Sequence, residues 1–128
     1  MAYSYSVKAL ETAHISFRDL LNAQSPAKPS IRIYDIGNVL LGSILLADPS
    51  CGVVSAVTGQ CVFTIDTQED AALATGEADH GEICDGNGDA HLTLDCQAGS
   101  SPVSGALVLG TLSIVIGTPI DIVSATIG

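Results

Sequence analysis

The hydrophobic positions of the chain recur with two different periods. Near the start, apolar positions recur three and four residues apart within residues 7–23, at Leu10, Ala13 or His14, Phe17, Leu20 and Leu21, which is the spacing of one face of an α-helix. Ser6 stands where it can cap the first turn. The pattern predicts a short amphipathic helix, which needs a surface to lie on because an isolated helix of this length is marginal.

Two prolines mark the end of the predicted helix. Pro26 and Pro29 lie in residues 25–29, and a residue that precedes proline is pushed out of helical geometry. We therefore expect a helix and stiff linker over residues 1–29, followed by a β domain over residues 30–128.

From residue 30 onward the pattern is that of β-strands. Residues 31–34 alternate as in a half-buried strand, and residues 39–46 form a continuous apolar run, typical of a strand covered on both faces. Further strands are predicted at residues 61–65, 71–78, 82–84, 90–95, 111–116 and 119–126, the last two joined at Gly117-Thr118. Short strands without an intervening helical pattern indicate a mainly β fold, an antiparallel β-sandwich or barrel.

The segment Asp85-Gly86-Asn87-Gly88-Asp89 is a strong turn signal between two predicted strands. Asn-Gly and Asp-Gly pairs tolerate the positive φ angles that tight hairpins require. Residues 31–35 and 81–85 share the same pattern of a strand that runs into Asp. Residues 99–105, rich in Ser and Gly, are expected to form a loop.

The charges are distributed very unevenly. Lys8, Arg18, Lys28 and Arg32 are the only cations, whereas residues 33–128 carry 12 acidic residues and no Lys or Arg. A body without cations cannot neutralise phosphates or an anionic leaflet, so we expect neither nucleic acid nor a membrane as a partner. Only 14% of all residues are charged, and the mean hydropathy is +0.44, which favours a protein that covers part of its surface with partners.

Targeting and redox signals are sparse. The first residues lack the apolar core of a secretory leader, and no apolar stretch reaches the roughly 18 residues of a membrane span. Four cysteines, at positions 51, 61, 84 and 96, leave three alternatives open. Buried thiols are favoured over two disulfides or a metal site, because no leader is evident and no C-x-x-C spacing is present.

The turn at residues 85–89 also places Asp85, Asn87 and Asp89 at alternate positions, like the start of a calcium loop. Such a loop continues with Gly at its sixth position and Glu at its twelfth, where this chain has Ala90 and Cys96. A plain hairpin turn is therefore the preferred interpretation, with Asp85, Asn87 and Asp89 as a weak metal candidate.

The remaining titratable residues do not form a recognisable catalytic pattern. His80 and His91 lie near Asp79, Glu82 and Cys84 in the sequence, but nothing in the spacing fixes a geometry, and we expect both histidines to be solvated. The acids are scattered, and nucleophile-elbow, phosphate-loop and dinucleotide motifs are absent. We predict no catalytic residue, no cofactor and no enzymatic activity.

Several motifs occur in an order that resembles a family of small virion proteins of tailed bacteriophages. The family pattern has an N-terminal helix, a Leu-Arg-Ile-Tyr-Asp strand, a Leu-Leu-Ala segment before Asp-Pro, an Ala-Thr-Gly-Thr-Ala strand, an Asp-x-Asp-Gly hairpin and a paired C-terminal β segment. The corresponding residues here are 31–35, 44–49, 74–80, 83–88, 112–117 and 120–126. The chain departs from the pattern near Gly81 and Glu82, where the family usually has an aromatic residue and an Arg, and at residues 36–38, where the segment after the first strand is often longer.

The resemblance implies a structural virion protein, a capsid decoration or cement protein or another minor component, with a neck, collar or tail protein as the alternative. Its expected partners are major capsid, neck or tail proteins and copies of itself in a symmetric assembly, placed in the virion after assembly in the host cytoplasm. A calcium- or carbohydrate-binding adhesion module is an alternative of another class. The N-terminal cations favour an anchoring arm, with these predicted partner-binding residues: Lys8, Leu10, Phe17, Arg18, Leu21, Lys28 and Arg32.

Overall fold

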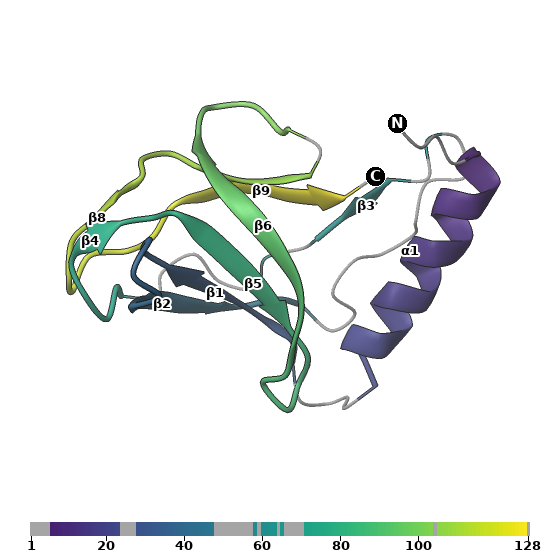
Figure 1. Ribbon diagram of the computed structural model, residues 1–128, viewed down its shortest axis with the longest axis horizontal. Coiled ribbons are helices and arrows are strands. Elements are labelled where there is room, and N and C mark those ends of the chain that lie inside the picture. Colours follow the sequence, from purple (N-terminus) through teal and green to yellow (C-terminus); the bar gives the residue numbers. More distant parts are fainter. Residues whose placement is uncertain are drawn as a thin grey trace.

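The computed structural model describes residues 6–23, 28–47, 58, 60–63, 65, 71–103 and 105–127. In these residues the fold is mainly β with one N-terminal helix, as the pattern predicts (Figure 1). The elements are α1 (Val7–Leu21), β1 (Ser30–Tyr34), β2 (Leu40–Leu45), β3 (Cys61–Val62), β4 (Gly76–Glu77), β5 (His80–Cys84), β6 (Ala90–Ala98), β7 (Ala106–Leu109), β8 (Ser113–Ile114) and β9 (Ile122–Ile127).

Seven strands form one curled sheet in the order β2-β1-β5-β6-β7-β9-β3, and β4 pairs with β8 in a small second sheet. An antiparallel bridge joins Leu46, after β2, to Ile65, after β3. Because β2 and β3 are the two edges of the large sheet, this bridge brings the edges together and the sheet approaches a barrel. The predicted sandwich or barrel architecture is therefore confirmed.

One neighbouring pair departs from the antiparallel pattern, since β6 and β7 are parallel. Parallel neighbours ordinarily need a crossover of a dozen or more residues, whereas residues 99–105 make this connection alone. The connection has to return along the length of β7, which has only four residues and is about 13 Å long. Seven extended residues can span roughly 23 Å, so the short connection suffices. The amide of Gly105, which ends the loop, donates to the Thr126 carbonyl at 2.8 Å.

The helix α1 begins as predicted and ends two residues earlier than residue 23. The Ser6 hydroxyl accepts a hydrogen bond from the Ala9 amide at 3.1 Å and caps the first turn. At the other end Leu21 is fully buried. The Phe17 ring packs edge-on against Phe63, with 6.2 Å between centroids. The helix therefore shares the core of the β domain, although the predicted linker falls partly outside the described residues.

The C-terminal strands differ from the predicted hairpin at Gly117-Thr118. β8 pairs with β4, whereas β9 pairs with β7 and β3, so the two strands are not partners of each other. Within residues 71–78 only β4 is a strand. The segment Gly117-Thr118 is held by Ala72 instead. The Ala72 amide donates to the Thr118 carbonyl at 2.8 Å, and the Gly117 amide donates to the Ala72 carbonyl at 2.9 Å. These long-range bonds replace the local pairing, which the sequence pattern alone had favoured.

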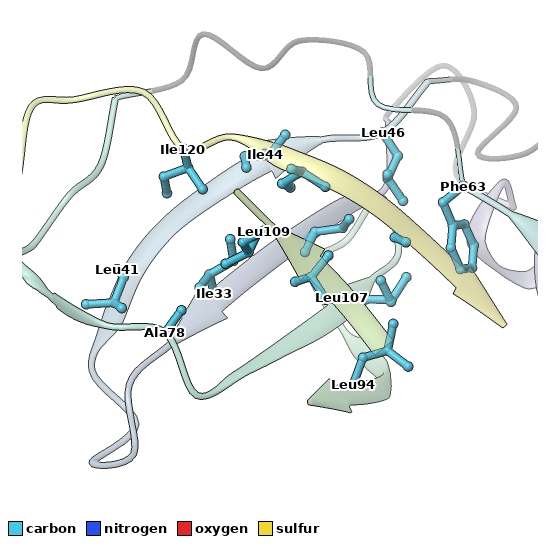
Figure 2. Packing of buried hydrophobic residues seen from close by; sticks show 14 of the residues in the cluster. Ile33, Leu41, Ile44, Leu46, Phe63, Ala78, Leu94, Leu107, Leu109 and Ile120 are labelled. Carbon is cyan, nitrogen blue, oxygen red and sulfur yellow. The ribbon is translucent and has the colours of Figure 1, made fainter. Parts of the chain in front are cut away.

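The core consists of aliphatic side chains that point toward one another from opposite parts of the curled sheet (Figure 2). Gly81 of β5 lets the layers touch, because a Cβ there would lie 2.6 Å from the Leu107 Cδ2 atom of β7. Gly42 of β2 is covered by the Ile120 side chain in the same way.

Candidate functional site

Asp35 organises the turn between β1 and β2. Its Oδ1 atom accepts hydrogen bonds from the amides of Gly37 at 2.8 Å and Val39 at 2.9 Å. The Asp35 amide donates to the Val39 carbonyl at 3.1 Å. Asn38 adopts a positive φ of 62°, a conformation that Asn tolerates better than most residues. The turn is therefore closed by a carboxylate and one left-handed residue.

Asp85 organises the turn between β5 and β6 in the same way. Its Oδ1 atom accepts from the amides of Asn87 at 2.9 Å and Asp89 at 3.1 Å, and its own amide donates to the Asp89 carbonyl at 3.0 Å. The left-handed position is Gly88, with a φ of 86°. Both turns are followed by a register shift, so the strand-into-Asp pattern corresponds to a repeated hairpin.

The second carboxylate oxygen of Asp85 has a side-chain partner, His91. Asp85 Oδ2 lies 2.8 Å from His91 Nε2. Asp85 is 5% exposed, which is unusual for an ionised carboxylate without such partners. The hydrogen bond from His91 lowers the pKa of Asp85 below its ordinary value of 3.8; burial opposes this effect, and the amides of Asp89 and Asn87 support it.

Arg32 lies beside the same turn. A Cβ at Gly88 would be 2.8 Å from Arg32 Nη2, so the guanidinium passes directly over the turn. Arg32 of β1 is also the register partner of Glu82 of β5. The β5–β6 turn is therefore held by the hydrogen bond between Asp85 and His91 and is flanked by the Arg32 guanidinium at Gly88.

The calcium interpretation of this turn competes with the hydrogen bonds just described. Both oxygens of Asp85 are engaged by Asn87, Asp89 and His91, and the turn of Asp35 has the same backbone with Gly and Val at the corresponding positions. The hairpin geometry therefore requires no ion. Within the described ranges, no group of three or more His, Cys, Asp and Glu residues is placed to hold a metal.

The other histidine of the β domain also has a structural environment. His80 Nδ1 lies 2.8 Å from Asp79 Oδ2, and its ring stacks on Tyr34 with centroids 5.4 Å apart. Burial, together with Glu82, raises the pKa of Tyr34, while Arg32 lowers it. The expectation that both histidines are merely solvated is incomplete, because each imidazole is oriented by a carboxylate.

Three of the four cysteines lie in the described residues, and Cys51 lies outside them. Cys61 and Cys84 are buried and Cys96 is half-buried. Burial raises the pKa of Cys96 to about 12, with help from Asp79 and Asp95, and burial also raises the pKa of Cys84. These thiols are poor nucleophiles at neutral pH and act as small apolar side chains.

Sequence reasoning missed a concentration of exposed apolar side chains at the end of the molecule that carries β4 and β8, opposite α1 (Figure 1). We call it the distal apolar end. It comprises Ile36, Val39, Leu73, Val115 and Ile116, of which Ile36 is 86% exposed. These residues come from three loops, none of which has the periodicity that reveals an apolar face.

Hydrogen bonds join two of these loops to each other and to β2. The Leu73 amide donates to the Leu41 carbonyl of β2 at 2.8 Å, and the Ile116 amide donates to Thr75 Oγ1 at 3.0 Å. A hollow of about 250 Å³ adjoins the distal apolar end and is lined by Ile36, Glu77, Ala78 and Asp79. The distal apolar end is therefore a surface built on fixed loops, next to a small acidic hollow.

The predicted partner-binding residues are spread over two environments. Lys8 and Lys28 are exposed, and Leu10, Arg18 and Arg32 are half-buried. Phe17 and Leu21 pack into the protein's own core, so Leu21 presents no surface to a partner in this conformation. The exposed face of α1 is instead formed mainly by small residues between Ala9 and Leu20.

No protein-family model, curated protein or solved structure matches the chain. In the part of the chain that the structure describes, α1 is too short and too polar to serve as a membrane-crossing helix.

Proposed function

We propose that the protein is a structural component of a larger symmetric assembly, with a packing role and no catalytic role. The single observation that carries this proposal is the distal apolar end. Five large apolar side chains from three loops are 48–86% exposed there, in a chain with only 14% charged residues. Exposed apolar side chains gathered at one end of a molecule are typical of protein–protein contact sites.

The polar cluster around Asp85 supports the same proposal by its chemistry. Asp85 already accepts hydrogen bonds at both oxygens, and its lowered pKa keeps it ionised and tied to the turn. A general acid or base needs a proton to exchange near neutral pH and access to a substrate. The cluster therefore serves hairpin closure better than catalysis.

The assembly that we propose is the virion of a tailed bacteriophage, in which the protein serves as capsid decoration or another minor structural component. This assignment rests on the order of the motifs that resemble those virion proteins, from Ile31-Arg32-Ile33-Tyr34-Asp35 to the hairpin at residues 83–88. The mainly β fold with its N-terminal helix is compatible with that pattern. A neck, collar or tail position follows from the same resemblance and differs only in the partner protein.

Mass spectrometry of purified phage particles tests this proposal. We expect the chain in stoichiometric amounts in particles from a host that carries its gene, and a particle map should show density for it at a fixed site. The variant Ile116→Asp should be depleted from particles, because it places a charge in the distal apolar end. The control Gln97→Asp, on an exposed position of β6, should be incorporated normally. Particles that lack the chain altogether would refute the assignment.

A further inference from the structure

One asparagine stands in a peptide that can modify itself. Of the three asparagines in the chain, Asn87 alone is followed by glycine, Gly88. Glycine has no side chain to block its amide nitrogen, so a neighbouring carbonyl carbon can approach it closely. We propose that Asn87 is a modification site, which becomes aspartate or isoaspartate, and that Asp85 restrains this reaction while the β5–β6 hairpin is closed. The site does not depend on the proposed packing role.

The reaction requires water and no other reagent. The Gly88 amide nitrogen loses its proton and attacks the side-chain Cγ atom of Asn87, so that a new C–N bond forms. The bond between Cγ and the side-chain nitrogen breaks, and that nitrogen takes up a proton and leaves as ammonia. Water then hydrolyses the cyclic imide. Cleavage between Cγ and the Gly88 nitrogen gives aspartate, and cleavage at the main-chain carbonyl of Asn87 gives isoaspartate, in which the main chain runs through the former side chain.

The side chain that would react is exposed, whereas the attacking nitrogen is held. Asn87 is exposed at the hairpin tip. The Gly88 amide donates to the Asp85 carbonyl at 2.9 Å. Asp85 Oδ1 accepts from the amides on either side, those of Asn87 at 2.9 Å and Asp89 at 3.1 Å. A hydrogen bond donated by the neutral amide disfavours its deprotonation, and the neighbouring bonds keep the nitrogen from turning toward Cγ. The closed turn therefore slows the attack.

Asp85 is fixed in this position by its own contacts. It is largely buried, and its Oδ2 atom lies 2.8 Å from His91 Nε2. Three consecutive amides of the tip therefore depend on one residue that is anchored outside the tip. Opening of the turn releases the Gly88 nitrogen, so the reaction should proceed at a rate set by the population of the open form.

The β1–β2 hairpin has the same turn without the reactive pair. Asp35 accepts from the amides of Gly37 and Val39, and Gly37 occupies the position that Asn87 has in the other turn. The asparagine of this hairpin, Asn38, is the left-handed residue. It is followed by Val39, whose branched side chain hinders attack by its amide nitrogen. The modification is therefore expected in one of the two hairpins.

Modification should prevent the turn from closing again in the same way. Isoaspartate at this position adds an atom to the main chain, so the amides of Gly88 and Asp89 no longer meet Asp85 at the same distances. Both products also place a new carboxylate between Asp85 and Asp89, and like charges at short range repel. The modified residue is then a one-way record that the hairpin has opened.

The rate of conversion in the full-length chain tests the proposal. Folded and urea-unfolded protein are incubated at pH 8, and peptide mapping by tandem mass spectrometry measures aspartate and isoaspartate in place of Asn87. The folded protein should convert at least ~10-fold more slowly than the unfolded chain. Asp85→Ala, under conditions where it is folded, should convert about 10-fold faster than the folded wild type, because two hydrogen bonds of the turn are lost. The modified fraction should melt at a lower temperature than the unmodified protein.

Two further variants separate the role of Asp85 from general loss of stability. Asp35→Ala makes the same substitution in the other hairpin and should leave the rate at Asn87 unchanged. If Asp85→Ala fails to fold, His91→Ala takes its place, since it removes the partner of Asp85 Oδ2 and should also accelerate the conversion.

Each part of the proposal can fail separately. An unfolded chain that keeps Asn87 intact, or that converts Asn38 equally fast, would overturn the site. Equal rates in the folded and unfolded protein, or a folded variant at Asp85 or His91 that converts no faster than the wild type, would overturn the restraint by Asp85. A modified fraction that melts like the unmodified protein would show that the turn closes again.

Discussion

The β1–β2 and β5–β6 hairpins have nearly the same backbone and opposite surfaces. Each begins with an Asp whose Oδ1 atom accepts from the amides two and four residues later, and each has its positive φ three residues after that Asp. At the β1–β2 tip Ile36 and Val39 are exposed. At the β5–β6 tip the corresponding positions are Gly86 and Asp89.

The two hairpins are also related by their place in the sheet. β1 and β5 are antiparallel neighbours, and Arg32 and Glu82 are register partners, each three residues before the Asp of its own turn. The tips therefore point to opposite ends of the sheet. Backbone geometry is set by the Asp and the left-handed residue, so the other tip residues can differ: one tip became apolar surface and the other was closed by Arg32 and His91.

The largest effect should come from the two turn carboxylates. Asp85→Ala removes the acceptor of two amide groups and of His91. These donors then lie unpaired at a largely buried site, so the melting temperature should fall by roughly 5–10 °C. Asp35→Ala removes acceptors for two amides at a more exposed turn and should lower it by about half as much. Differential scanning calorimetry measures both, and equal shifts would show that the His91 contact adds nothing.

Acidification should reduce the difference between the hairpins. The folded-state pKa of Asp85 lies below its ordinary value of 3.8, so the unfolded chain binds the proton more tightly. The stabilisation by Asp85 is fully present above about pH 4 and is lost as pH falls through the lower folded-state pKa. Urea unfolding should show a difference in unfolding free energy between the wild type and Asp85→Asn at pH 7, and this difference should shrink below pH 4. A difference that does not depend on pH would contradict an ionised carboxylate at Asp85.

Exchanging the two left-handed residues tests the contact with Arg32. Gly88→Asn keeps a residue that tolerates positive φ, but its Cβ would meet Arg32 Nη2 at 2.8 Å, so we expect a loss of about 1 kcal/mol of unfolding free energy. Asn38→Gly should change that free energy by less than about 0.5 kcal/mol. Chemical denaturation of the two variants gives the comparison, and the reverse ranking would show that Arg32 moves away at no cost.

The apolar tip should matter for association and hardly at all for folding. Ile36→Asp replaces a side chain that is 86% exposed, so the unfolding free energy should change by less than about 0.5 kcal/mol. The oligomer of this variant should nevertheless dissociate at a higher protein concentration than the wild-type oligomer. Asn87→Ser at the other tip, also exposed, should affect neither property. Analytical ultracentrifugation over a concentration series distinguishes the two tips, and identical profiles would remove Ile36 from the contact.

The residue just before the turn Asp is Tyr34 in the β1–β2 hairpin and Cys84 in the β5–β6 hairpin. The smallest effect concerns the reactivity of the Cys84 thiol, measured together with that of Cys96. Burial raises the pKa of Cys84 and that of Cys96 to about 12. Cys84 should therefore react with iodoacetamide at pH 8 more slowly than in the unfolded chain, and Cys96 at least ~100-fold more slowly. Site-resolved mass spectrometry measures this, with the guanidinium-unfolded protein as the control. Rapid labelling of Cys84 in the folded protein would show that this hairpin opens.

The sequence by itself determined the local structure with a short-range cause. The helix with its Ser6 cap, the strand-into-Asp repeat and the turn at residues 85–89 were all readable, because capping, periodicity and turn chemistry act within a few residues. The same reasoning predicted the mainly β fold. It could not pair the C-terminal strands correctly, because β8 and β9 are held by partners distant in the sequence.

Only the tertiary structure decided which surfaces exist. The distal apolar end combines loops from three parts of the chain, and each loop alone contains no more than two of its exposed apolar residues. The contact of Arg32 with the Gly88 turn and the burial of Leu21 in the common core likewise depend on how the sheet curls. Such contacts form between residues far apart in the sequence, where the fold and not local propensity determines which side chains meet.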